Sequence, residues 1–220
     1  MKEFFKKIAR GFVSSVIFCY CKVVYRIKIV GKENIPKDGA LLFCGNHRTY
    51  LDPPLIVVTA GRKMSFLAKD ELKKNPLMRF LRYIFDGIWV KRDSKDIGPL
   101  KESLKILKSG GCVGLFPEGT RNGMEKNDGK MKNGAAYMAL KTGAKIIPIG
   151  IQGTAKPFSK NAIIYGEPID CNQYIGEKVD KDAENKVTEV LKEQIIMLTN
   201  QKIWYIILWL KNVGARGTVP

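Results

Sequence analysis

The sequence GALLFCGNHRTYLDPPLIVVTAG, residues 39–61, contains an apolar run, a short polar loop and a second apolar run. The first run, Gly39–His47, has the length and composition of a buried strand. In the second run, Asp52 is a candidate N-cap, and Pro53 and Pro54 suit the first turn of a helix. Because a strand followed at once by a helix is the repeating unit of α/β proteins, this stretch predicts that class.

The same alternation continues to the end of the chain. Further strands are expected at Lys63–Lys69, 86–93, 112–116, 145–154 and 162–169. Helices are expected at Asn75–Phe85, Asp96–Gly111, 132–144 and about Asp180–Leu198. Helical segments between strands imply crossover connections. Since no internal repeat or linker divides the chain, we predict one α/β domain over residues 31–220, with a mixed, largely parallel sheet flanked by helices.

The charge of the chain is strongly positive. Lysine and arginine number 38 against 21 acidic residues, which gives a formal net charge of +17. This excess favours a polyanionic partner: nucleic acid, an anionic membrane surface or a phosphorylated substrate. The five cysteines form no CxxC pair, and the chain has one histidine, which argues against a structural zinc site. We expect reduced thiols that pack as small apolar groups.

Residues 1–30 predict an N-terminal, membrane-associated helical element. Large apolar side chains recur there at helical spacing among lysines, at Phe4, Phe5, Ile8, Phe12 and Val16. The uncharged run from Gly11 to Cys21 is shorter than the roughly 20 residues that a spanning helix needs. An amphipathic helix that docks on the protein's own core is the alternative interpretation.

The other end of the chain is similar. Residues 195–212 are apolar nearly all round, and Trp204, Tyr205 and Trp209 suit a lipid headgroup boundary. The pattern leaves open whether this segment enters a bilayer or packs on the domain. Two apolar, aromatic, lysine-flanked ends favour an anionic membrane surface as the partner, and no nucleic acid. We therefore predict a monotopic or peripheral protein on the cytoplasmic face of the cell membrane.

The single histidine, His47, ends the first expected strand, and Asp52 follows five residues later. Imidazole is suited to removing a proton at neutral pH, and a carboxylate on its second nitrogen would orient it. The turn-prone Asp-Pro-Pro allows the loop to fold back and bring the two side chains together. Asp52 can also serve only as a helix cap, and both roles can hold at once.

Cationic groups follow two other expected strands. Lys91 and Arg92 are adjacent and can hold a phosphate, although a solvated strand end is an equal alternative. In FPEGTRNG, residues 116–123, Glu118, Thr120 and Arg121 follow a buried strand, and Gly119 permits a sharp turn. Arg121 suits a phosphate, and Glu118 suits a hydroxyl or the arginine itself.

A fourth segment, residues 146–154, is an apolar strand interrupted by Pro148, which must lie at a sheet edge or a bulge. It suits the wall of an acyl-chain site, and a plain core strand is the alternative. The glycines near residue 110 form neither a dinucleotide fingerprint nor a P-loop. No G-x-S-x-G elbow is present, which argues against a serine hydrolase.

Taken in order, NHRTYLD, GIWVKRD, FPEGTRN and IIPIGI resemble the four motif blocks of the glycerolipid acyltransferase family. The likeness is greatest to its bacterial 1-acyl-sn-glycerol-3-phosphate acyltransferases and covers about Leu41 to Thr154. It implies His47 as general base and Asp52 as its partner. It further implies an acceptor-phosphate site and an acyl-donor region. The first comprises Lys91, Arg92, Glu118, Gly119, Thr120 and Arg121, and the second Pro148 and Ile149.

The resemblance also implies a reaction. An acyl group would pass from acyl-CoA or acyl-carrier protein to lysophosphatidic acid, giving phosphatidic acid, with no cofactor and no metal. Related transferases use other acceptors, such as glycerol 3-phosphate or another lysophospholipid, and this alternative remains open. A non-catalytic basic protein that binds membranes is the alternative from another class. It gives no reason for a histidine, two cationic sites and a glutamate at successive strand ends.

Overall fold

The computed structural model describes residues 1–91, 96–123, 130–154, 156–174 and 180–200. Its centre is a seven-stranded sheet in the order β1–β7–β6–β2–β5–β3–β4. The strands are β1 (Ile27–Val30), β2 (Leu41–Gly45), β3 (Met64–Lys69), β4 (Ile88–Val90), β5 (Cys112–Leu115), β6 (Lys145–Gln152) and β7 (Asn161–Tyr165). In this described part, β6 and β7 pair antiparallel and the other neighbours pair parallel. The predicted mixed, largely parallel sheet is confirmed.

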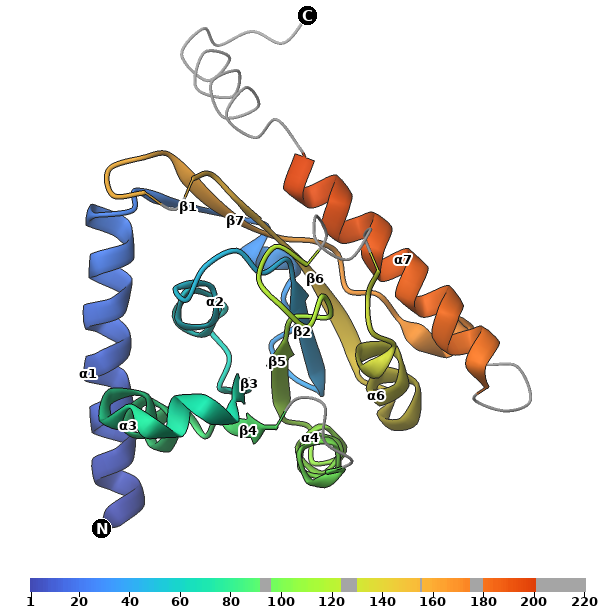
Figure 1. Cartoon of the computed structure of the whole chain (residues 1–220), viewed down its shortest axis with the longest axis horizontal. Helices are drawn as coiled ribbons and strands as arrows, with labels where there is room; N and C mark the ends of the chain where they lie inside the picture. The colour runs from blue at the N-terminus through green and yellow to red at the C-terminus, as the bar shows by residue number, and fades with distance from the viewer. Residues whose placement is uncertain (92–95, 124–129, 155, 175–179, 201–220) are drawn as a thin grey trace, which may run out of the picture.

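Helices cover both faces of the sheet. In Figure 1, α1 (Lys2–Val23) and α2 (Asp52–Thr59) lie on one side, and α4 (Gly98–Lys108), α6 (Gly134–Thr142) and α7 (Lys181–Asn200) lie on the other. The helix α3 (Pro76–Phe85) contacts both α1 and β3. Short 3-10 turns are η1 (Lys32–Asn34), η2 (Asp70–Lys74) and η3 (Cys171–Tyr174).

The strand β2 explains why the quoted apolar run decides the fold. Leu41 and Phe43 pack into the core cluster beneath α1 and α2. Leu42 and Cys44 pack on the opposite face, against α4, α6 and α7. A strand covered on both faces needs an unbroken apolar run, since alternate side chains point to opposite sides. Each fully buried large side chain contributes roughly 1.5–3 kcal/mol to folding.

Pro148 lies inside the sheet, so the edge alternative is wrong and the bulge alternative is confirmed. β6 has β2 on one side and β7 on the other. The Pro148 carbonyl accepts from Gly166 N, so its imide nitrogen faces the same flank. There the pairing shifts from Ile149–Tyr165 to an isolated bridge between Ile146 and Ile169, which inserts one extra residue. The missing N–H therefore falls where the ladder is already interrupted.

The N-terminal element differs from the prediction in one respect. The helix ends at Val23, and residues 27–30 form β1, which pairs parallel with β7 and belongs to the main sheet. The helical part of the predicted 1–30 unit is therefore shorter, because the alternating sequence Ile-Lys-Ile-Val favours a half-buried strand. Among the described helices, none is both long enough and apolar enough to cross a bilayer.

The predicted apolar stripe of α1 is exposed rather than packed on the core. Phe12 exposes 71% of its surface, and four other large apolar side chains are exposed beside it, Phe4, Phe5, Ile8 and Val16. The opposite side of α1 makes the contacts with the domain, through Ile17 and Cys21. Asp86, after α3, pairs with Lys6 and Arg10 of α1.

The parallel strands bring the candidate residues to one edge of the sheet. β6, β2, β5, β3 and β4 are neighbours and run in the same direction, so their carboxyl ends meet at that edge. His47 follows β2, Phe116 follows β5 and Lys91 follows β4. This is the edge at which α/β sheets bind ligands.

Candidate active site

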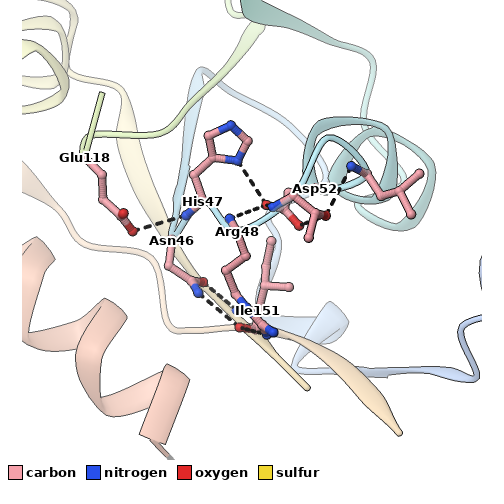
Figure 2. A network of polar contacts seen from close by, with 8 residues as sticks. Asn46, His47, Arg48, Asp52, Glu118 and Ile151 are labelled. Atoms are coloured by element: carbon pink, nitrogen blue, oxygen red, sulfur yellow. Dashed lines mark hydrogen bonds and ion pairs between the residues drawn. The ribbon is translucent and has the colours of Figure 1, made fainter. Parts of the chain in front are cut away.

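Asp52 organises the loop that follows β2. Its Oδ2 lies 3.0 Å from His47 Nδ1 and accepts the backbone N–H groups of Arg48 at 2.6 Å and Thr49 at 2.7 Å. Its Oδ1 accepts the Thr49 hydroxyl at 3.0 Å. Asp52 exposes only 3% of its surface, so these donors replace water around its charge. The loop folds back as predicted, and Figure 2 shows His47 and Asp52 facing each other.

Asp52 is not the N-cap of its helix. It is the first residue of α2, Leu51 holds the cap position, and no side chain there caps the helix. The carboxylate instead accepts from Arg48 and Thr49, which precede the helix, so its charge interacts with the histidine loop. A carboxylate beside Nδ1 requires a proton on that nitrogen, so Nε2 of His47 carries the free lone pair. The pair therefore has the arrangement of a general base with its orienting acid.

The segment FPEGTRN, residues 116–122, holds the backbone and the ring of His47. His47 N–H donates to Glu118 Oε1 at 3.1 Å, and the His47 carbonyl accepts from Asn122 N at 2.6 Å. The Phe116 ring stacks on the imidazole, with centroids 4.0 Å apart and planes 6° apart. These contacts and Asp52 fix the position and the plane of the base, and Figure 2 shows those made by Glu118 and Asp52.

A glycine makes room for this aromatic stack. Phe66 of β3 packs against Phe116, with ring centroids 5.1 Å apart. A Cβ on Gly114 would lie 2.3 Å from the Phe66 ring, so any side chain there would displace it. Successive packing contacts therefore connect the centre of the sheet to the base, in the order Gly114, Phe66, Phe116 and His47.

Asn46 was not predicted, and it connects β2 to β6 beyond the last paired residues. Its Nδ2 donates to the Ile151 carbonyl at 3.0 Å, and its Oδ1 accepts Ile151 N–H at 2.7 Å. Arg48 Nη1 donates to the same carbonyl at 3.1 Å. The sequence signal that could have found Asn46 is its position directly after the apolar run of β2. A polar side chain at that position is expected to be buried, and a buried amide needs hydrogen-bond partners.

The predicted acceptor residues occupy different environments. Glu118 is buried, and its described contact is to His47 N–H. Gly119 has φ +69°, as the turn requires, and a Cβ there would approach Lys132 Cε to 3.0 Å. Thr120 is half-buried and Arg121 is exposed, with its Cζ 3.9 Å over the Tyr50 ring. The structure thus brings Arg121 beside the histidine loop.

Two other predicted groups are placed differently. Lys91 is exposed at the end of β4, whereas Arg92 lies outside the described residues. Pro148 and Ile149 are buried within β6. Further along the same strand, Ile151 and Gln152 line a small hollow between α1 and the His47–Asp52 loop. The assignment of Pro148 and Ile149 to the acyl donor stays a prediction.

The cysteines and the acidic groups show no second reactive centre in the described part of the chain. No group of three or more His, Cys, Asp or Glu side chains there is arranged to hold a metal ion. Burial raises the pKa of the Cys44 and Cys112 thiols, and it raises that of Cys171 to about 12. These buried thiols stay protonated at neutral pH and are poor nucleophiles, as the sequence predicted. Cys19 differs from the prediction, because it is exposed on α1 and does not pack as a small apolar group.

Comparisons with known proteins identify the family of this chain. The acyltransferase family model matches residues 26–152. A 1-acyl-sn-glycerol-3-phosphate acyltransferase of Borreliella burgdorferi is 30% identical over 179 residues, 78% of this chain and 70% of that protein. The Bacillus subtilis protein of the same name is 29% identical over 186 residues, 80% of this chain and 89% of its own length. This chain belongs to the acyltransferase family.

A solved structure extends the likeness to three dimensions. The crystal structure of the 1-acyl-sn-glycerophosphate (LPA) acyltransferase PlsC from Thermotoga maritima matches with a TM-score of 0.63 and 28% sequence identity. The match covers 89% of this chain and 83% of that one. The resemblance drawn from the four sequence blocks is therefore confirmed at the level of the family and the fold.

Proposed function

We propose that the protein transfers a fatty acyl group from an acyl thioester to the free hydroxyl of 1-acyl-sn-glycerol 3-phosphate, giving phosphatidic acid. The observation that carries this proposal is the 3.0 Å contact between His47 Nδ1 and Asp52, which leaves Nε2 as the free base. Arg121, an exposed cation on the adjacent loop, suits the acceptor's phosphate. The names of the two bacterial relatives and of the crystallised protein support this acceptor.

In the proposed reaction, His47 Nε2 removes the proton from the acceptor hydroxyl as its oxygen attacks the thioester carbonyl. The imidazolium that forms is stabilised by Asp52, which already accepts from Nδ1. The tetrahedral intermediate then expels the thiolate, which takes the proton back from Nε2 and leaves as a free thiol. The bond formed is an oxygen ester, the bond broken is the thioester, and no acyl group is held by the protein.

The donor is acyl-CoA or acyl-carrier protein, because a thioester is already activated for acyl transfer and the step needs no further cofactor. Both donors carry the acyl group on a phosphopantetheine arm, and the basic chain suits either acidic carrier. Positioning supplies much of the rate, since holding the phosphate fixes the distance from the hydroxyl to the carbonyl.

The proposed location is the cytoplasmic face of the cell membrane, with the protein bound to an anionic surface as a monotopic or peripheral protein. The exposed stripe of α1 supports this, because large apolar side chains flanked by lysines suit the interface of a bilayer. The exposed Leu77, Phe80 and Tyr83 of α3 add apolar surface beside it. Sedimentation with anionic and with zwitterionic vesicles tests this location; equal, salt-insensitive partition into both would contradict the electrostatic part.

An acceptor panel at one fixed acyl-CoA concentration tests the proposed reaction. The acceptors are lysophosphatidic acid, glycerol 3-phosphate, lysophosphatidylcholine and monoacylglycerol, and the readout is release of free thiol together with the acylated product. We expect the highest kcat/KM with lysophosphatidic acid. A higher value with glycerol 3-phosphate or with lysophosphatidylcholine would overturn the proposed acceptor, and thiol release without any acceptor would overturn direct transfer.

A further inference from the structure

Tyr50 belongs to the His47 loop, yet neither the proposed reaction nor the core uses it. Its side chain exposes 67% of its surface. Within the described part of the chain it makes no hydrogen bond, and its one side-chain contact of note is with Arg121, whose Cζ lies 3.9 Å over the ring. That distance is well inside the range at which a cation is attracted to an aromatic face.

In the described part of the chain, no acidic side chain forms an ion pair with Arg121. The two acids of these loops are committed elsewhere: Asp52 to the groups of its own loop, and Glu118 to His47 N–H. A guanidinium attracted to a ring through its face keeps its N–H edges available, and these edges match a phosphate in a bidentate contact.

The backbone also ties Arg121 to the base. The next residue, Asn122, donates its N–H to the His47 carbonyl at 2.6 Å. Tyr50 approaches from the other loop, three residues after His47. Two contacts thus restrict the positions that the guanidinium can take. The backbone of its own loop is bonded to His47, and the Tyr50 ring lies against the guanidinium itself. Without the ring, a long exposed arginine side chain would populate many rotamers, and ordering it on binding would reduce acceptor affinity.

We infer that Tyr50 is a positioning residue that holds Arg121 ready for a dianionic phosphomonoester on the acceptor. This inference rests on the proposed function, in which Arg121 binds the acceptor phosphate. Tyr50 therefore acts on acceptor binding and not on proton transfer. It contributes little to folding, because an exposed side chain without hydrogen bonds has little to lose on truncation.

Steady-state kinetics on the full chain test this inference, with a short-chain, water-soluble lysophosphatidic acid that removes vesicle binding from the measurement. Tyr50→Ala raises the KM for this acceptor by about threefold to thirtyfold, the range that a cation–aromatic contact supplies, and leaves kcat within about twofold. Tyr50→Phe keeps the aromatic face and restores the KM. Turnover of monoacylglycerol, which has no phosphate, does not change.

A double-mutant cycle with Arg121→Ala separates the inference from the proposed function. Arg121→Ala raises the KM more than Tyr50→Ala does, and adding Tyr50→Ala in that background changes nothing further. If Arg121→Ala leaves the acceptor KM unchanged, the proposed role of Arg121 fails. If Arg121→Ala raises it and Tyr50→Ala does not, or if the Tyr50 effect persists without Arg121, the inference alone is overturned.

Tyr137→Ala is the matched control, since this tyrosine of α6 also lies under a cation, with Lys141 Nζ 6.0 Å from its ring. It should leave the acceptor KM unchanged. The remaining alternative is that Tyr50 is an aromatic residue at the membrane surface. In that case Tyr50→Ala would weaken binding to anionic vesicles and leave the KM for the soluble acceptor unchanged, and this outcome would also overturn the inference.

Discussion

The histidine loop, residues 46–52, and the helix α1 are both held to the domain by polar contacts, but to very different degrees. In the loop, buried groups satisfy one another: Asp52 accepts from three residues, and Asn46 pairs with both backbone groups of Ile151. In α1, the contacts with α3 depend largely on one partly exposed carboxylate, Asp86, and the apolar stripe faces outward. The polar groups of the loop find their partners within the domain, whereas the apolar stripe of α1 is not covered by the described part of the chain.

Among the changes that keep His47, Asp52→Asn should have the largest effect, because three donors converge on Asp52 Oδ2. An amide cannot accept from all of them and does not stabilise the imidazolium. We expect kcat to fall by about 10³–10⁴-fold, as in other bases that lose an orienting carboxylate. Steady-state thiol release measures this; retention of activity within tenfold would contradict the role of Asp52.

Asn46→Ala should have the next largest effect, because it removes the acceptor of Ile151 N–H and one donor to its carbonyl. We expect a loss of about 1–3 kcal/mol in the free energy of unfolding, the cost of leaving a buried group unpaired. We also expect kcat to fall about tenfold, since the residue precedes His47. Urea unfolding and kinetics measure both.

Asn133→Ala is the control for that change. Asn133 also uses both ends of its amide, with Asn185 and Thr188, but it lies between α6 and α7. It should lower stability without a specific effect on kcat. Equal loss of kcat in both variants would mean that Asn46 acts only through stability.

Asp86→Asn tests how α1 is held. Burial raises the pKa of Asp86, but hydrogen bonds from Lys6 and Lys63 outweigh it, so the net pKa is lowered. The carboxylate therefore stabilises the fold above its unfolded-state pKa of about 4, and this stability is lost as the pH falls through the lower folded-state value. We expect Asp86→Asn to cost about 1 kcal/mol at pH 7, because the side chain is 32% exposed.

The pH dependence supplies the check on that prediction. The difference between the parent chain and Asp86→Asn should shrink in urea titrations as the pH is lowered below about 4, since the Asp86 carboxylate progressively takes up a proton and loses its charge. Lys69 and Glu71 form an exposed ion pair at the end of β3, and Glu71→Gln there is the control. A difference that grows toward acid would show that Asp86 is not stabilised as a carboxylate.

The smallest effect on stability should come from Phe4→Ser with Phe12→Ser, because both side chains are exposed. In the proposed function these side chains are buried only when the protein binds a membrane. Vesicle binding should therefore fall by about tenfold or more, while kcat/KM for a soluble acceptor stays constant. Flotation with anionic vesicles measures the binding. Unchanged binding would move the proposed membrane contact away from this stripe.

The main features of the fold were predictable because they depend on local pattern. The apolar run of β2 and the proline-started helix after it carry the signals of a βα unit. The pairing of His47 with Asp52 was predictable for the same reason, since it closes within five residues. The β1 strand was missed because four residues after a helix give a weak signal, and its partner β7 is far along the chain.

The surroundings of the base were not predictable. Asn46 bonds to Ile151, 105 residues away, and the Phe116 stack forms only when β2 and β5 become neighbours. The role of Asp52 also differs from a helix cap, because its first contacts lie before the helix. Periodicity found the apolar stripe of α1 but could not say which face would be covered.

Replacement of His47 is the decisive test of the proposal that this residue is the base that activates the acceptor hydroxyl. The measurement is free-thiol release from acyl-CoA with lysophosphatidic acid by His47→Ala. A melting curve and a vesicle-binding assay on the same preparation show whether the fold and the membrane contact persist. We expect thiol release at the uncatalysed rate, with melting temperature and vesicle binding close to the parent values. Turnover within tenfold of the parent chain would contradict it.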